Sequence, residues 1–519
     1  MSTSNFVVDL IATIDSITKT PIPNTTTENG MPAYSTTESA LLDLFSKTIR
    51  GTPKSVINEM FENAFKEDPK IALQIAFNTR DCIGQGKQEK DLALYMMEWV
   101  KVNKPLNYLK NLPEYLNISC FKDLLKMSLT VPHRIMSDVE LQLMSAYIQD
   151  DLKKLNEYNS AIDAASSEDD KKKIPKISLS MAAKWAPTEG CHFDKLIKAA
   201  HRIAKMQGIN MKTYRKNLGK LRAQLDILER HESFREWDKI NFEHVPATAM
   251  KKQKKAFQKH CSEGFANYLA KVMAGKAKMH TKGVQPHELV ATYINGSTTD
   301  PVVDAQWSSL ISSIKTAGLF KNAISVCDVS GSMSGIPMQV AIALGLVVSE
   351  MTIEPFNNKI ITFDAVPQWH TINGTTLQQK VSNLARAKWG MNTDFIAVFN
   401  MLLTEAKAYN LSPEQMIKKI FVFTDMQFDQ ATNDDSYMTG FDHVKKMYAD
   451  AGYAIPTIVF WNLRDTRTSF PVQKDTPNVA LMSGFSSEML KVFLEDGDMT
   501  PYSIMMRAVS GYKVTIVPE

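Results

Sequence analysis

The spacing of hydrophobic residues changes near residue 320 of the chain, and the two patterns predict different architectures. Between residues 35 and 316, apolar residues recur every three to four positions, as Leu92, Met96 and Trp99 do in "EKDLALYMMEWVKV". This is the spacing of one helix face, and short polar turns separate the segments that show it. The pattern predicts an all-α domain of stacked helical hairpins, a helical-repeat (HEAT-like) arrangement, although no fixed repeat period is present.

Local signals refine this first half. Residues 1–34 are rich in Thr, Ser, Asn and Pro and are predicted to be an irregular N-terminal segment. Ser35 and Glu38 have the spacing of a capping box, and Asp68 followed by Pro69 predicts the start of a helix. Residues 157–177 contain "SSEDDKKKIPK", a charged and Ser-rich sequence that predicts an exposed loop.

From residue 320 onward the apolar runs become short and nearly continuous. "NAISVCD", "NKIITFD", "KKIFVFTD" and "IPTIVFW" are too short for helices and fit strands buried on both faces. Helical segments lie between them, so residues 320–519 are predicted to form an α/β domain with a doubly wound, mostly parallel sheet. Ligands collect at the carboxyl ends of such strands, which is where Asp328, Asp364 and Asp425 lie.

Composition restricts the class of protein. The chain has 519 residues, 44% hydrophobic and 22% charged, which is typical of a folded soluble protein of two or three domains. The five cysteines are scattered without a Cys-x-x-Cys pair, so neither a disulfide framework nor a zinc knuckle is predicted. A reducing, intracellular and cytoplasmic setting is expected. The N-terminus lacks the pattern of a signal peptide, and no apolar run is long enough to span a membrane.

The sequence "CDVSGSMSG" places three oxygen-bearing side chains at alternate positions directly after a predicted strand: Asp328, Ser330 and Ser332. Such oxygens suit hard cations such as Mg²⁺, Mn²⁺ or Ca²⁺. Thr393 in "WGMNTDF" and Asp425 in "VFTDMQFD" are expected on neighbouring loops, where they would complete the site. The alternative is that Asp328 and the serines only cap a helix or shape a turn.

This five-residue set resembles the metal-ion-dependent adhesion site (MIDAS) of von Willebrand factor type A domains. The resemblance implies that the two serines and the threonine contact the metal, that the aspartates act largely through water, and that an acidic group of a partner takes the open position. The chain departs from the family pattern at Met391-Asn392 and at Met426, where glycines are common. These changes reshape the rim without removing a ligand.

A wider resemblance covers roughly residues 27–512. Segments such as "TENGMPAYSTTESALLDLF", "LSMAAKWAPTE", "REWDKINFEHVPATAMKKQKKAF" and "MIKKIFVFTDMQFDQA" resemble an uncharacterised family, domain of unknown function 2828, with members in plants, fungi and large DNA viruses. Its layout is similar to that of the TROVE/Ro RNA-binding proteins, in which a helical-repeat domain precedes a type A domain. That similarity implies a ring of helices that binds RNA, at the level of fold analogy.

Charge is strongly segregated along the chain. Residues 195–282 contain 21 Lys and Arg against 7 Asp and Glu, an excess of 14, whereas the whole chain carries +4, so the remainder carries −10. Tyr214 and Phe257 are interleaved with the basic residues, a pattern typical of surfaces that bind single-stranded nucleic acid. The alternative is a solvated basic face, or one that contacts protein. The candidate nucleic-acid contacts are Lys212, Arg215, Lys216, Lys251, Lys252, Lys254 and Lys255.

Other chemical signals are weaker. "GQGKQEK", residues 84–90, lacks the Gly-x-x-x-x-Gly-Lys-Ser/Thr pattern of a phosphate-binding loop and favours a turn between helices. An aspartyl phosphatase would carry a second acid where Ser330 stands. We therefore expect a binding protein rather than an enzyme. Two alternatives remain open: a metal-dependent phosphoester hydrolase, and a structural protein, packaged in a virion if virus-encoded, whose metal only stabilises the fold.

Overall fold

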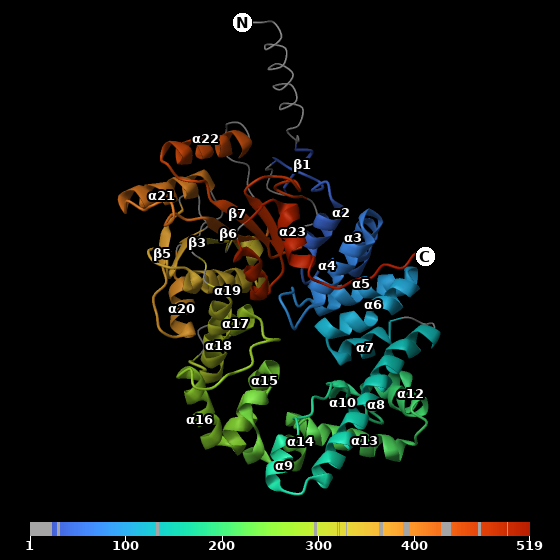
Figure 1. Ribbon diagram of the computed structural model, residues 1–519. Helices are drawn as coiled ribbons and strands as arrows, with labels where there is room; N and C mark the ends of the chain where they lie inside the picture. The colour runs from blue at the N-terminus through green and yellow to red at the C-terminus, as the bar shows by residue number, and fades with distance from the viewer. Residues whose placement is uncertain are drawn as a thin grey trace.

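The computed structural model describes residues 23–27, 32–130, 134–294, 298–318, 320, 322–328, 330–362, 367–387, 395–426, 437–465, 469–495 and 497–519. Residues 40–317 form a helical region, and residues 323–509 form a sheet region (Figure 1). The boundary between them agrees with the change of hydrophobic spacing near residue 320.

The helical region begins after a short antiparallel ladder of β1 (Thr25–Thr26) and β2 (Pro32–Ala33), which lies in the segment predicted to be irregular. Its helices are α2 (Ala40–Lys47), α3 (Lys54–Glu67), α4 (Pro69–Arg80), α5 (Lys90–Asn103), α6 (Pro105–Ile118), α7 (Phe121–Met127), α8 (Arg134–Ala164), α9 (Glu168–Lys173), α10 (Ala182–Trp185), α11 (His192–Ile197), α12 (Ala199–Met206), α13 (Met211–Gln224), α14 (Leu228–Phe234), α15 (Ala247–His260), α16 (Ser262–Met273), α17 (Pro286–Ile294) and α18 (Pro301–Ala317), with 3₁₀ turns η1 (Trp237–Lys239) and η2 (Phe242–His244).

Capping explains where several of these helices begin. The Asp68 carboxylate accepts the N–H groups of Lys70 and Ile71, so the predicted start of α4 is confirmed. The capping box predicted at residues 35–38 is wrong, because Ser39 is the N-cap of α2 and Glu38 has a left-handed φ of 66°. The loop predicted at 157–177 is mostly helical although exposed, because α8 extends to residue 164 and Ser167 caps α9.

Within the described residues, the sheet region contains a mixed sheet of six strands in the order β5-β4-β3-β6-β7-β8. The pairs among β4, β3, β6, β7 and β8 are parallel, and only the edge pair β4–β5 is antiparallel. Four strands fall on the predicted apolar runs, which confirms those predictions; β5 and β8 were not predicted. The strands are β3 (Ala323–Cys327), β4 (Lys359–Thr362), β5 (Trp369–Thr371), β6 (Lys419–Thr424), β7 (Thr457–Asn462) and β8 (Val479–Ser483).

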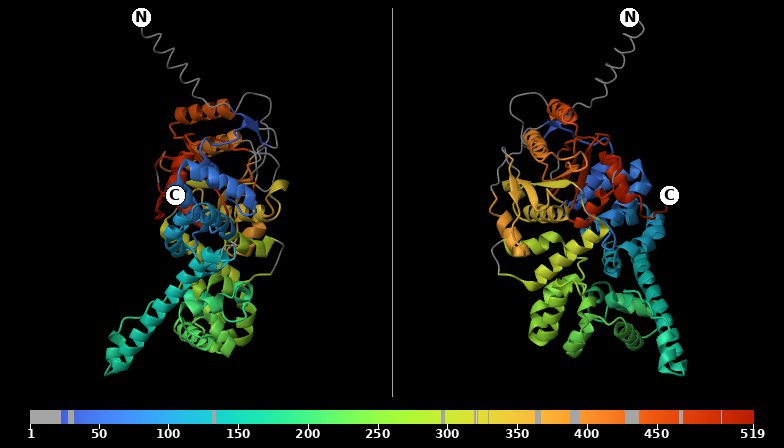
Figure 2. Two further views of the ribbon diagram at one scale, coloured as in Figure 1. Left: turned by 90° about the vertical axis from the view of Figure 1, so that its right-hand side faces the viewer. Right: turned by 60° about the vertical axis from the view of Figure 1, so that its left-hand side comes forward.

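Helices lie on both sides of this sheet. In Figures 1 and 2, α19 and α20 lie below it, and α21 and α22 lie above it. The central strands β3, β6 and β7 are buried along their whole length, which explains their continuous Ile, Val and Phe runs. The helices of this region are α19 (Ile336–Met351), α20 (Leu377–Leu384), α21 (Phe395–Ala408), α22 (Tyr437–Asp450) and α23 (Pro501–Val509), with 3₁₀ turns η3 (Gly331–Met333) and η4 (Ser487–Phe493).

The helical region contacts the sheet region at both of its ends. At its start, α2 packs on β8 and α4 packs on α23; at its end, α17 packs on α19 and α20. The chain therefore follows a closed path, down through α7, across α8 to α14, and back up through α15 to α18 (Figure 1). In the part of the chain that the structure describes, no helix has the length and apolarity needed to cross a membrane.

Candidate metal-binding site

Two aspartates lie at the carboxyl ends of adjacent strands. Asp328 directly follows β3, and Asp425 directly follows β6. These strands pair in parallel, with Cys327 opposite Phe423, and the Asp328 N–H donates to the Phe423 carbonyl over 2.9 Å. The hydrogen-bonded ladder therefore brings both carboxylates to one edge of the sheet, which is the arrangement predicted from the sequence.

The loop after β3 places two hydroxyls near the Asp328 carboxylate. Its Oδ1 accepts the Ser330 N–H at 2.9 Å, and the hydroxyl oxygens of Ser330 and Ser332 are 3.0 Å apart. Met333, in η3, is fully buried and anchors the loop. Ser332 is exposed and Ser330 is half-buried, whereas the exposed fractions of Asp328 and Asp425 are 2% and 1%. The hydroxyls therefore face solvent and the carboxylates lie beneath them. We call Asp328, Ser330, Ser332 and Asp425 the strand-end site.

The strand-end site concentrates negative charge. Burial raises the pKa of Asp328, and the nearby Asp425 carboxylate raises it further, while hydrogen bonds from Ser330 and Thr424 oppose the shift. The Thr424 hydroxyl donates to Asp328 Oδ2 over 2.9 Å. Two carboxylates this deeply buried repel each other, and a bound cation would offset both the repulsion and the loss of hydration.

The residues present fit a hard cation. The predicted fifth ligand, Thr393, lies outside the described residues, as does Asp364. The described residues contain no group of three or more His, Cys, Asp or Glu side chains that could hold a metal ion. The strand-end site has only two side chains of these four types, Asp328 and Asp425. Its other oxygens belong to hydroxyls, which coordinate Mg²⁺ and Ca²⁺ but not soft metals.

One side chain at this site was not predicted. Arg464, just after β7, is exposed, and its guanidinium donates to the backbone carbonyl of Ser332. Because β7 is the next parallel neighbour of β6, the rule that ligands gather at strand ends would have identified this position.

On α13 and α15, fewer of the candidate basic residues are free of acidic partners within the chain than the sequence suggested. Lys251 pairs with Glu288 at 3.4 Å, and Lys254 pairs with Asp300. Arg215, although exposed, pairs with Glu189. The exposed lysines among the candidates are Lys212, Lys216, Lys252 and Lys255.

The aromatic part of the nucleic-acid prediction is wrong. Tyr214 and Phe257 are both 0% exposed, because each occupies the core-facing side of an amphipathic helix. Neither ring can stack on a base. A nucleic acid could contact this region only through its phosphates.

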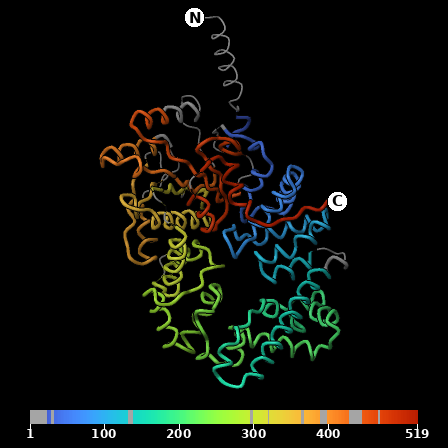
Figure 3. The backbone as a smooth tube through the Cα atoms, viewed as in Figure 1, coloured from blue at the N-terminus to red at the C-terminus, as the bar shows by residue number. Residues whose placement is uncertain are grey.

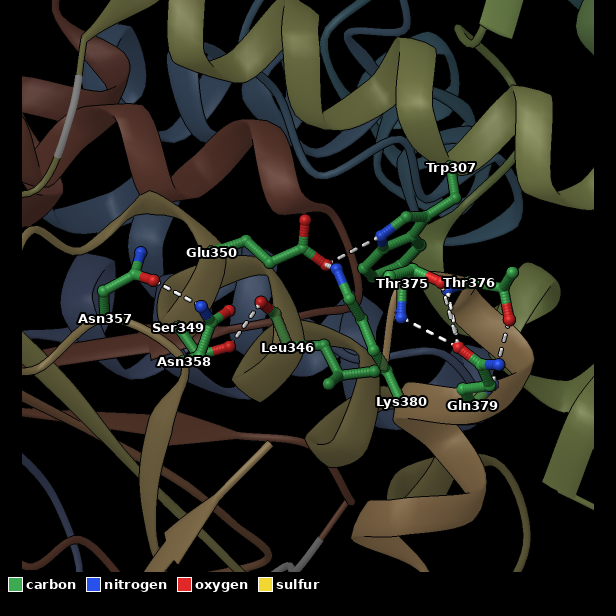
Figure 4. A network of polar contacts seen from close by, with 10 residues as sticks. All are labelled: Trp307, Leu346, Ser349, Glu350, Asn357, Asn358, Thr375, Thr376, Gln379 and Lys380. Carbon is green, nitrogen blue, oxygen red and sulfur yellow. Dashed lines mark hydrogen bonds and ion pairs between the residues drawn. The ribbon is translucent and has the colours of Figure 1, made fainter. Parts of the chain in front are cut away.

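A separate pocket of about 290 Å³ lies where α18, α19 and α20 meet. Figure 4 shows the Glu350 carboxylate facing Trp307 and Lys380, which donate to its Oε1 over 3.0 and 2.8 Å. At the start of α20, Gln379 Oε1 accepts the N–H groups of Thr375 and Thr376, and the Gln379 N–H donates to the Thr376 hydroxyl. The Trp307–Glu350 bond joins the helical region to the sheet region, and the two donors satisfy the charge of Glu350 within the chain, so these contacts indicate a structural junction.

Comparisons with known proteins match nearly the whole chain. Residues 27–162 and 124–320 match a family described as "Domain of unknown function (DUF2828)", and residues 322–511 match "Domain of unknown function (DUF7788)". The chain is 35% identical over 514 residues to "Uncharacterized protein L728" of Acanthamoeba polyphaga mimivirus, covering 94% of this chain and 87% of that protein. No solved structure matches.

Proposed function

The chain belongs to the family described as Domain of unknown function (DUF2828), and we propose that it is a metal-dependent binding protein. A divalent cation, Mg²⁺ or a similar hard ion, is held at the strand-end site together with Thr393. Its open coordination position takes an acidic group of a protein partner. The observation that carries this proposal is the pair of buried carboxylates beneath two solvent-facing hydroxyls.

The chemistry of the donor set supports this role. Mg²⁺ takes six oxygens and keeps several waters. Three hydroxyls and waters held by Asp328 and Asp425 would leave a position for an oxygen from outside. The parallel order β4-β3-β6-β7-β8, with the site at the carboxyl ends, also supports a domain of the von Willebrand factor type A kind.

A hydrolase is the rival from another class. Hydrolysis of a phosphoester calls for a group that exchanges a proton with the attacking water or the leaving oxygen. The basic side chain that the described structure places against the Asp328–Ser332 loop is Arg464, and a guanidinium stays protonated. This chemistry favours binding over catalysis.

A second surface for RNA remains part of the proposal. Lys252 and Lys255 are exposed on α15, three residues apart, so they lie on one helix face. Exposed Lys259, four residues further on, extends that face. Because Phe257 is buried, this surface would contact RNA phosphates without stacking on bases.

The metal is tested by removing both hydroxyls. Ser330→Ala with Ser332→Ala removes two hard ligands at the loop surface, so Mg²⁺ and Mn²⁺ binding should be lost while the fold persists. In the wild type, a ligand at 100 times its Kd adds about 2.7 kcal/mol to the free energy of unfolding, and the double variant should not show this gain. Ser334→Ala is the matched control, an exposed serine of the same loop outside the alternating triplet. Calorimetry that finds unchanged metal affinity in the double variant rules out the site.

The partner is tested by metal removal. If the cation bridges to an acidic group, EDTA should release the partner, and Mg²⁺ should restore the complex. If the protein is structural and its cation only stabilises the fold, EDTA should lower the melting temperature without releasing any partner at a temperature where the fold persists.

A further inference from the structure

After α23 the chain turns at residues 510–512 and then crosses the helical region as residues 513–519. Residues 510–519 leave α23, part of the sheet region, and run along α4 and α6 (Figure 3). We call residues 510–519 the C-terminal segment. Side-chain amides from both helices hold its backbone, and these amides are buried: Gln74 3%, Asn107 2% and Asn111 1% exposed.

Two asparagines of α6 bind the segment as a β-strand would. Asn111 donates to the Thr515 carbonyl over 2.7 Å and accepts the Thr515 N–H at 2.8 Å. Asn107 makes the same pair of bonds to Val517, at 2.8 and 2.9 Å. A side-chain amide carries the donor and the acceptor of a peptide group, so each asparagine pairs with a whole residue of backbone.

The spacing of the asparagines matches the repeat of the segment. Asn107 and Asn111 are four residues apart on a helix, a rise of about 6 Å. Thr515 and Val517 are two residues apart in an extended chain, a rise of roughly 6.6 Å. The helix therefore holds alternate backbone units, and the contacts depend little on which side chains the segment carries.

Two side chains of the segment supply anchors at its ends. The Tyr512 hydroxyl donates to Asp81 Oδ2 over 2.8 Å, and the Tyr512 ring packs edge-on against Phe77. The backbone carbonyl of Tyr512 also accepts from Gln74 at 2.9 Å. At the other end, Glu519 Oε1 accepts the Asn107 backbone N–H at 2.7 Å, in the first turn of α6. An acid is favoured there by the helix dipole.

We infer that the α4–α6 face is a peptide-binding groove. The C-terminal segment is its resident ligand, and the partner that fits is an extended protein segment with an aromatic residue followed seven positions later by an acid. Most of the contacts reach backbone atoms that every peptide has. The two anchors supply the preference for particular side chains, as in the recognition of other extended peptides. This inference is independent of the strand-end site.

The resident segment competes with any added peptide. A ligand tethered beside its site acts at an effective concentration on the order of millimolar, so the wild-type groove is nearly closed to peptide in trans. Tyr512→Ala with Glu519→Gln, in the full chain, weakens both anchors and leaves every groove residue unchanged. We call this the anchor variant.

The test uses a fluorescein-labelled peptide of residues 509–519 and fluorescence anisotropy. The anchor variant should bind the peptide saturably with one site, and the wild type should bind it at least about tenfold more weakly because of the tethered competitor. Adding Asn107→Ala and Asn111→Ala to the anchor variant should weaken binding by at least about tenfold, since four hydrogen bonds are lost. Asn117→Ala, an exposed asparagine of α6, is the control and should change nothing. A cooperatively folded anchor variant that shows no saturable binding overturns the inference.

Hydrogen exchange provides a test that needs no variant. In the wild type, the Thr515 and Val517 amides should exchange through local release of the segment, faster than the amides of the buried strand β6. If they exchange only with global unfolding, the segment is a fixed part of the fold and the groove does not exchange ligands.

Discussion

The strand-end site and the surroundings of Lys87 are both clusters of polar groups around buried ionisable side chains, two acids in the first and a lysine in the second. At the strand ends, two carboxylates are buried beneath exposed hydroxyls. At the contact between α2 and β8, the Lys87 ammonium is 0% exposed and donates to Ser483 Oγ over 2.7 Å and to the Phe45 carbonyl. The acids lie one layer below solvent, whereas the lysine is enclosed on every side by the chain.

We propose that this difference separates a binding site from a structural contact. The Lys87 acceptors are neutral and belong to the chain itself, so the cluster joins the helical region to the sheet region. In the binding proposal, a cation from solvent would reach the strand-end site past Ser332, which is exposed. Substitutions in clusters that the chain encloses, such as that of Lys87, should therefore change the free energy of unfolding. Substitutions in the strand-end site should mainly change binding.

Breaking the closed ion pair in the helical region should cost most. Lys101 and Glu140 are 2.7 Å apart with both side chains 0% exposed, and Lys101 also donates to the Met127 carbonyl. Lys101→Met leaves a buried carboxylate without its cation, so the free energy of unfolding should fall by about 3–5 kcal/mol, measured by urea denaturation.

The matched control is the exposed pair Lys66–Glu62, at 2.8 Å with side chains 67% and 48% exposed. Lys66→Met should change stability by less than about 1 kcal/mol. Equal small losses in both variants would contradict the view that enclosure makes such clusters structural.

Asp425→Asn should separate binding from stability at the open site. The substitution removes one of two repelling carboxylates, so the metal-free protein should lose much less unfolding free energy than Lys101→Met does. Divalent-metal affinity should fall by about 10–100-fold, as when outer ligands of metal sites are lost, and partner binding should fall with it. Calorimetry and urea denaturation measure the two effects.

The same variant tests the hydrolase alternative. Wild-type protein should show no turnover on nucleotide, phosphoester or peptide panels with Mg²⁺ or Mn²⁺. Metal-dependent turnover that disappears in Asp425→Asn, and is not due to a contaminant, would replace the binding proposal with a catalytic one.

The sequence predicted what depends on local pattern. Runs of Ile, Val and Phe identified β3, β4, β6 and β7, and the position of Asp328 and Asp425 after two of them predicted the strand-end site. The edge strand β5 has only three residues, Trp369–Thr371, too few to show a period. Such a short strand is identified by its pairing with a neighbouring strand and not by its own sequence.

Contacts between distant segments could not be predicted in this way. Asn111 and Thr515 are 404 positions apart, and nothing in the spacing of either segment indicates that they meet. Tyr214 and Phe257 were assigned to a nucleic-acid surface because of the lysines beside them, but their positions on amphipathic helices place them in the core. In these helices hydrophobic periodicity decided orientation, and local charge did not.

Lys87 should make stability depend on pH. Burial lowers its pKa from the ordinary 10.5 to about 7, so between these values the unfolded chain holds a proton that the folded chain lacks. Unfolding free energy should therefore rise with pH from about 7 toward 10, with a contribution of at most about 1.4 kcal/mol per pH unit. Lys87→Met should remove this contribution, which urea denaturation at pH 6.5 to 9.5 measures. An unchanged slope in the variant would show that Lys87 is not the group responsible.

The smallest effect concerns the two kinds of lysine on α15. Lys252 and Lys255 are exposed, whereas Lys251 and Lys254 pair with acids of the chain. If the exposed pair contacts RNA phosphates, Lys252→Gln with Lys255→Gln should reduce the slope of log affinity against log salt by about 1.4, roughly 0.7 for each contact with a single strand. Lys251→Gln with Lys254→Gln is the matched control, and it should leave the slope nearly unchanged because those charges are already neutralised. Equal changes in both variants would indicate a diffuse effect of net charge, and wild-type protein without measurable RNA affinity at low salt would remove RNA from the proposal.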